Sequence, residues 1–199
     1  MTILSESEVR SRARVEKSQR VNLNKSFDQI LSEESKSFSI AKTYDIFLSH
    51  SVKDSEIILG IKGILEDLGY SVYIDWIDDH QLDRSKVNKS TADLLRERMN
   101  ASKALLFVTT DNSIASKWMP WECGYFDALK QKVAIVPVKK SPASDEYKGQ
   151  EYLGLYSYCL KHKSKGGSEI LYVHKDKNHY IPYSVWIDKS NSEIEWLEQ

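Results

Sequence analysis

Short apolar runs recur about every thirty residues along the chain, and segments with helical periodicity lie between them. Residues 45–49, 72–76, 104–109 and 133–138 have the length and composition of buried strands. Buried strands joined by helical crossovers form a parallel sheet with helices on both faces. The sequence therefore predicts an α/β fold whose ligands bind beyond the carboxyl ends of the strands.

The first helix has the clearest pattern. Its apolar residues recur at helical spacing until Gly69, which favours a helix end. Ser51-x-x-Asp54 comes just before this pattern and predicts a capping box at the start of the helix.

The 199 residues divide by composition into three parts. Residues 1–42 are polar and rich in Ser, Glu, Lys and Arg, which predicts a helical or partly disordered N-terminal extension. Residues 43–140 hold the alternating strands and helices. Residues 141–199 are expected to complete the domain with added strands, since apolar runs flank the turn at Gly166-Gly167 as in a β-hairpin.

Charge and cysteine content disfavour several classes of protein. The 28 Lys and Arg residues nearly balance 29 Asp and Glu residues, so no general field attracts nucleic acid or anionic lipid. Cys123 and Cys159 lack C-x-x-C spacing, which argues against a disulfide framework or structural zinc. The start lacks a signal-peptide pattern, and no apolar run could span a bilayer. We expect a soluble cytoplasmic protein that binds neither nucleic acid nor membrane.

Polar residues capable of chemistry follow each predicted strand. They include Ser49-His50-Ser51 after the first strand, the loop from Trp76 to Lys86 after the second, and residues 110–113 after the third. Trp118 and Glu122, near the start of the next helix, are four positions apart and therefore lie on one helix face. We expect these groups to meet at one edge of the sheet.

The Trp118–Glu122 pair suits attack on a nucleotide's glycosidic bond. An indole can stack on a base or nicotinamide ring, and a carboxylate can stabilise the cationic sugar formed as the base departs. The same spacing also fits ordinary packing or solvent positions on an amphipathic helix. The sequence contains neither a G-x-x-x-x-G-K nor a G-x-G-x-x-G motif after a strand, so it lacks the phosphate-binding loops of P-loop NTPases and of classical dehydrogenases.

Several other residues could have a role in binding or catalysis, but ordinary packing, backbone contacts or solvation would also explain them. His50 could bind a phosphate or sugar hydroxyl, or be satisfied by nearby backbone. The acids and histidine at positions 78, 79, 80 and 83 lack the spacing of a metal site and suit a solvated loop. Cys123 has no obvious histidine partner and suits packing. We expect no metal and no bound cofactor.

The opening strand and loop, Tyr44-Asp45-Ile46-Phe47-Leu48-Ser49-His50, resemble those of the Toll/interleukin receptor (TIR) domain family. The resemblance covers about residues 43–140. It includes Leu68-Gly69-Tyr70 before the second strand and Thr109-Thr110-Asp111-Asn112-Ser113 after the third. Trp118-x-x-x-Glu122 falls where enzymatic TIR domains carry their catalytic glutamate.

The resemblance implies a flavodoxin-like sheet and cleavage of the nicotinamide–ribose bond of NAD⁺, with an ADP-ribose product that is cyclised in some members. By position, Glu122 takes the catalytic role and Trp118 stacks on the substrate. Ser49 and His50 would line the first loop, and Asp75 and Trp76 would start the loop after the second strand.

Tyr152-Leu153-Gly154 is similar to an element of compact bacterial TIR proteins of anti-phage defence, such as those of Thoeris systems. This similarity implies a downstream effector that senses the nucleotide product. The wider resemblance to TIR enzymes implies self-association through TIR surfaces, with the site completed between protomers. The charged loop at residues 77–88 lacks the Pro-Gly turn of receptor-type TIR domains, which argues against receptor-style docking. The alternatives are a non-enzymatic TIR–TIR scaffold and a nucleoside deoxyribosyltransferase-type enzyme.

Overall fold

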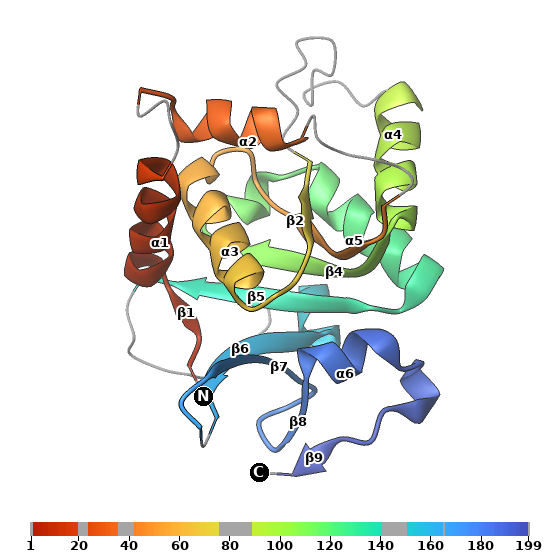
Figure 1. Cartoon of the computed structure of the whole chain (residues 1–199). Helices are drawn as coiled ribbons and strands as arrows, with labels where there is room; N and C mark the ends of the chain where they lie inside the picture. The colour runs from red at the N-terminus through yellow and green to blue at the C-terminus, as the bar shows by residue number, and fades with distance from the viewer. Residues whose placement is uncertain are drawn as a thin grey trace.

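A computed structural model describes residues 2–19, 24–35, 42–75, 89–140, 151–164 and 166–198 (Figure 1). Its strands are β1 (Leu4–Ser5), β2 (Tyr44–Ser49), β3 (Val72–Ile74), β4 (Ser102–Thr109), β5 (Val133–Lys139), β6 (Ser157–Lys163), β7 (Glu169–His174), β8 (His179–Pro182) and β9 (Leu197–Glu198). Its α-helices are α1 (Glu6–Ser18), α2 (Phe27–Ser35), α3 (Ser55–Asp67), α4 (Lys89–Asn100), α5 (Trp118–Lys130) and α6 (Tyr183–Asp188). Short 3₁₀ turns are η1 (Ser113–Ala115), η2 (Glu151–Leu155) and η3 (Asn191–Glu193).

The described strands form one mixed sheet in the order β3-β2-β4-β5-β6-β7-β8-β9. Strands β3 to β6 of this order run parallel, and β6 to β9 run antiparallel. The predicted α/β class is therefore confirmed, as is the C-terminal hairpin, which is formed by β6 and β7. The predicted second strand is shorter than expected, because β3 ends at Ile74 and Asp75 lies just beyond it; Trp76 lies outside the described residues.

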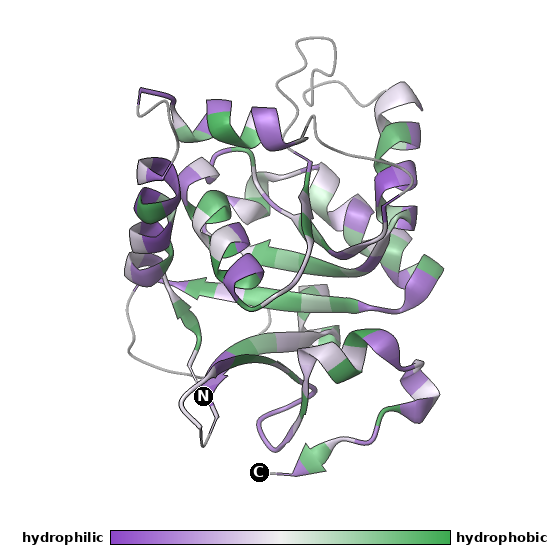
Figure 2. Cartoon of the chain, viewed as in Figure 1, coloured by the Kyte–Doolittle hydropathy of each residue, from purple (hydrophilic) through white to green (hydrophobic). Residues whose placement is uncertain are grey.

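Helices cover both faces of the sheet. Alternate residues of β2 point to opposite faces: Ile46 and Leu48 join the core beneath α3, while Phe47 joins the core beneath α4 and α5. Both sets are fully buried, so the strands read as continuous apolar runs, unlike the alternating pattern of a half-exposed sheet. Figure 2 shows this apolar character along β4 and β5 at the centre of the molecule.

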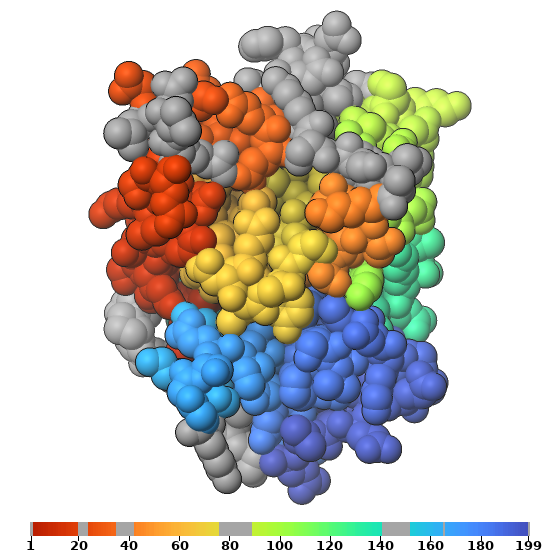
Figure 3. All heavy atoms as spheres, in the orientation of Figure 1, coloured from red at the N-terminus to blue at the C-terminus, as the bar shows by residue number. Residues whose placement is uncertain are grey.

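The N-terminal segment is built into the sheet and the core. Strand β1 pairs in parallel with the end of β5, and Thr2 bridges to Lys161 of β6. Helix α1 packs on α3, with Val9 and Ala13 fully buried. Figure 3 shows α1 and α2 lying side by side with α3 on one face of the molecule. The domain boundaries at residues 42 and 140 remain predictions.

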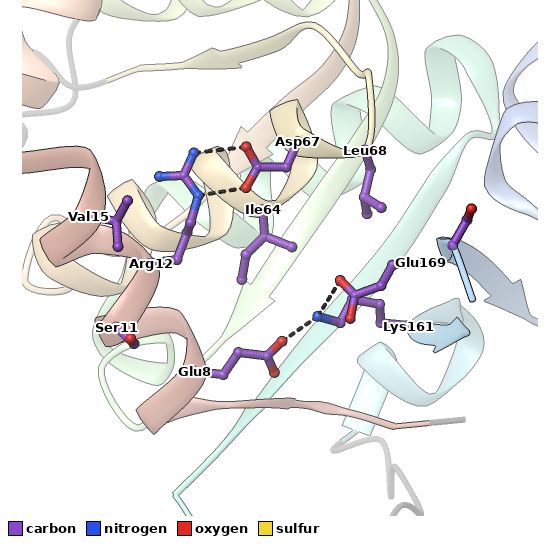
Figure 4. A pocket seen from close by; sticks show the side chains of 10 residues that line it. Glu8, Ser11, Arg12, Val15, Ile64, Asp67, Leu68, Lys161 and Glu169 are labelled. Carbon is purple, nitrogen blue, oxygen red and sulfur yellow. Dashed lines mark hydrogen bonds and ion pairs between the residues drawn. The ribbon is translucent and has the colours of Figure 1, made fainter. Parts of the chain in front are cut away.

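Ion pairs fasten α1 to its neighbours around an open cavity of about 610 Å³ (Figure 4). Arg12 donates two hydrogen bonds to the carboxylate of Asp67 on α3, at 2.6 and 3.0 Å. Lys161 on β6 pairs with Glu8 of α1 and with Glu169 of β7.

Within the described part of the chain, no helix is long and apolar enough to cross a bilayer.

Candidate active site

Three carboxylates are buried among the described residues, and all three follow carboxyl ends of parallel strands. Asp54 lies beyond β2, Asp75 follows β3, and Glu122 lies beyond β4 in α5. Their exposed fractions are 6%, 2% and 2%. Burying a carboxylate is costly unless hydrogen bonds or charges compensate it. Their common location marks this edge of the sheet as the place to look for chemistry.

Glu122 belongs to the buried face of α5. This face consists of Trp118, Met119, Glu122, Cys123 and Phe126. The Oγ atom of Ser116 accepts a hydrogen bond from the Met119 amide, which compensates one free amide at the start of the helix. The spacing that predicted Trp118 and Glu122 on one face is therefore confirmed, and that face points into the protein.

The Ser49 hydroxyl donates a hydrogen bond to Oε2 of Glu122, over a distance of 2.6 Å. Ser49 is the last residue of β2 and is 1% exposed. This contact joins β2, an inner strand of the sheet, to α5 across 73 positions of the sequence. Separate sequence patterns identified Ser49 and Glu122 as candidates. In the structure the two side chains are in direct contact.

His50 is also enclosed, with 2% of its surface exposed. Its Nδ1 atom lies 2.7 Å from the carbonyl oxygen of Leu48. Because a carbonyl only accepts, Nδ1 carries the proton in this contact. The contact holds the ring against its own strand. A role for His50 in binding substrate stays a prediction.

The capping box predicted at Ser51-x-x-Asp54 is wrong. Helix α3 begins at Ser55, and Asp54 is its N-cap residue without a side-chain bond to the helix amides. Its carboxylate instead accepts hydrogen bonds from Thr110 Oγ1 and Asn112 Nδ2, both at 2.6 Å. These tertiary bonds to the loop after β4 replace the local ones. They join the loop after β2 to the loop after β4.

Asp75 and Trp118 are enclosed as well. The Tyr73 hydroxyl donates to Oδ1 of Asp75 at 3.2 Å, and burial, with the nearby Asp75 charge, raises the pKa of Tyr73 far above its usual value. Trp118 is 5% exposed and meets Trp121 edge to face at 5.5 Å. Contacts of Asp75 and Trp118 with a substrate stay predictions, and Trp76 lies outside the described residues.

Cys123 follows Glu122 in the sequence. Its side chain is buried, with 1% of its surface exposed. Burial raises the pKa of its thiol to about 11, which keeps it protonated at neutral pH. This agrees with the packing role expected for it. Among the described residues, no group of three His, Cys, Asp or Glu side chains is placed to hold a metal ion. The loop at residues 78–83, considered above for a metal, lies outside the described ranges.

A sequence model of the TIR domain matches residues 46–167, which is more than half of the chain. The chain belongs to the TIR domain family. The match begins in β2 and ends in the turn between β6 and β7, so it includes Ser49, the buried acids and α5. The suspected family and its flavodoxin-like fold are thereby confirmed.

Two bacterial relatives carry enzyme names. The chain is 47% identical over 193 residues to a probable 3′ cyclic ADP-D-ribose synthase, ThsB′, of Bacillus cereus (strain MSX-D12). That similarity covers 96% of this chain and 100% of the relative, so it extends well beyond the TIR match. The chain is also 36% identical over 118 residues to a putative cyclic ADP-D-ribose synthase, TIR2, of Cytobacillus dafuensis, covering 59% of this chain and 30% of that protein.

Proposed function

We propose that this TIR protein cleaves the nicotinamide–ribose bond of NAD⁺ and releases a cyclic ADP-ribose product. The observation that carries the proposal is Glu122, a buried carboxylate held by Ser49 beyond the carboxyl end of a parallel strand. The names of both relatives, one of them similar along nearly the whole chain, support cyclic ADP-ribose synthesis.

The proposed chemistry follows from the charge changes in the reaction. As the glycosidic bond breaks, its electron pair leaves with nicotinamide, whose ring nitrogen loses its positive charge, and the ribose C1 becomes cationic. An ionised Glu122 next to this carbon would stabilise the developing cation, and the interaction is stronger in a site shielded from water. A hydroxyl of the same ADP-ribose then bonds to this carbon and releases its proton to solvent, or a ring nitrogen bonds to it directly, and either step closes the cycle. Water that bonds to the same carbon and releases a proton would give open ADP-ribose.

Burial favours the enzymatic alternative over the scaffold. An interaction module has no need to keep a carboxylate at 2% exposure, because enclosing that group costs free energy. A catalytic carboxylate gains from the same enclosure, since fewer water molecules compete for the sugar cation. The deoxyribosyltransferase alternative finds no support in the names of the relatives.

The remaining assignments complete the proposal. Trp118 and Trp76 would stack on or border the substrate, and His50 and Asp75 would line its path. Self-association through TIR surfaces would control activity, and a downstream effector would sense the product as part of anti-phage defence.

The test compares wild-type protein with Glu122→Gln, using NAD⁺ and mass spectrometry of nicotinamide and the nucleotide product. We expect equal amounts of nicotinamide and cyclic product from the wild type, measured over a series of protein concentrations. Glu122→Gln should lose about 100-fold or more of the rate. Glu198→Gln is the matched control, because the Glu198 side chain is 85% exposed.

Turnover that survives Glu122→Gln would remove the assigned catalytic residue. A wild-type protein that releases no nicotinamide at any concentration would support the scaffold alternative. Release of open ADP-ribose alone would keep the cleavage step and refute cyclisation.

A further inference from the structure

The contact between Ser49 and Glu122 joins two rigid parts of the fold. Ser49 ends β2, which lies between β3 and β4 in the sheet, and it pairs in register with Phe107 of β4. Glu122 lies within the second turn of α5, whose apolar face packs on the same strands. Both ends of the hydrogen bond therefore lie in regular elements that pack together in the core.

The direction of this hydrogen bond is set by chemistry. The Ser49 hydroxyl donates its single proton to Oε2 of Glu122, which is the direction that an ionised carboxylate requires because it can only accept. The distance of 2.6 Å lies in the range of hydroxyl–carboxylate bonds that are strengthened by charge. The one donor of Ser49 is thus committed to Glu122 and is not available to a ribose hydroxyl.

Resting on the function proposed above, we propose that Ser49 is a positioning residue that holds Glu122 ionised and correctly oriented for the departing sugar cation. A donor aimed at a carboxylate favours its charged form. It also selects one rotamer of a long side chain that otherwise samples several. This role differs from the substrate contact expected for Ser49 from the sequence.

The hydrogen bond could also serve only to satisfy a buried carboxylate. The two roles differ in what removal of the hydroxyl changes. If the bond is purely structural, its removal lowers thermal stability and leaves the pH dependence of turnover unaltered. If the bond positions Glu122, its removal alters the protonation of Glu122 during the reaction and so changes the pH profile.

The experiment compares Ser49→Ala, which lacks the hydroxyl, with Ser49→Thr, which keeps it. Ser102→Ala is the matched control. Ser102 is also a buried serine, but it begins β4 and donates to the carbonyl oxygen of Arg98. Initial rates of nicotinamide release are measured from acidic to neutral pH, together with thermal unfolding.

We expect Ser49→Ala to lower kcat by about 10- to 100-fold with little change in KM, since a hydrogen bond to a charged group is lost. The acidic limb of its pH profile should move to higher pH, because the ionised form of Glu122 loses a donor. Ser49→Thr should restore the wild-type limb. Ser102→Ala should lower the unfolding temperature and leave the pH profile unchanged.

A double-variant cycle keeps the test decisive if Ser49→Thr does not fit its enclosed position. Unfolding temperatures of Ser49→Ala, Glu122→Gln and the double variant should be non-additive, as expected for groups in contact. If Glu122→Gln is inactive but Ser49→Ala keeps the wild-type rate and pH limb, this inference fails and the proposed function stands. A rise in KM alone would restore Ser49 to the substrate contacts. If Glu122→Gln remains active, the proposed function fails first.

Discussion

Gly60 of α3 lies close against the backbone of α1. A Cβ atom placed on Gly60 would lie 2.0 Å from the carbonyl oxygen of Val9 and 2.8 Å from its carbonyl carbon. Backbone cannot turn aside as a side chain can, so Gly60→Ala requires α1 to retreat by roughly 1.5 Å. The variant therefore tests whether the N-terminal helix is seated on the TIR core.

The expected loss of stability combines three effects. Overpacking costs about 1–3 kcal/mol, and partial exposure of the buried Val9 adds about 1–2 kcal/mol. Alanine returns about 1 kcal/mol because it favours helix more than glycine does. The net loss of about 1–4 kcal/mol corresponds to a fall in unfolding temperature of about 2–16 °C for a chain of this size.

Two other glycines provide matched controls for the same substitution. At Gly63 the new Cβ would meet the guanidinium of Arg12 at 2.8 Å, which is the far end of a flexible side chain, so Gly63→Ala should cost little. At Gly124 in α5 nothing lies within 4 Å, so Gly124→Ala should raise stability by up to about 1 kcal/mol. Thermal and urea unfolding followed by circular dichroism measure the series. A Gly60→Ala protein as stable as Gly124→Ala would refute the packing of α1 on α3.

Two further predictions concern polar contacts of the strands and loops. Although burial opposes it, hydrogen bonds from Ser71 and Lys103 lower the pKa of Asp45. Asp45→Asn should therefore be less stable than wild type above the ordinary carboxyl pKa of about 4, and the difference should vanish as pH falls through the lowered value; a difference independent of pH would contradict this. Thr110→Val should cost about 1–3 kcal/mol in urea unfolding, because the Asp54 carboxylate loses a donor; an unchanged midpoint would show that this bond is dispensable.

Local patterns identified most elements because each depends on near neighbours in the chain. Apolar runs predicted the strands, since burial on both faces leaves no polar alternation to obscure them. Four-residue spacing placed Trp118 and Glu122 on one helix face, which the structure confirms. The capping box at Ser51 failed because Asp54 forms its hydrogen bonds with residues more than fifty positions away.

The sequence by itself determined the alternation of strands and helices, the family and the identity of the candidate acid. Only the tertiary structure decided that Glu122 points inward onto Ser49, that Asp54 links two loops, and that β1 and α1 are part of the core. Periodicity reports which face of an element is buried, since that depends on spacing within one segment. It does not report which groups meet across 73 positions, because such contacts depend on how separate elements pack.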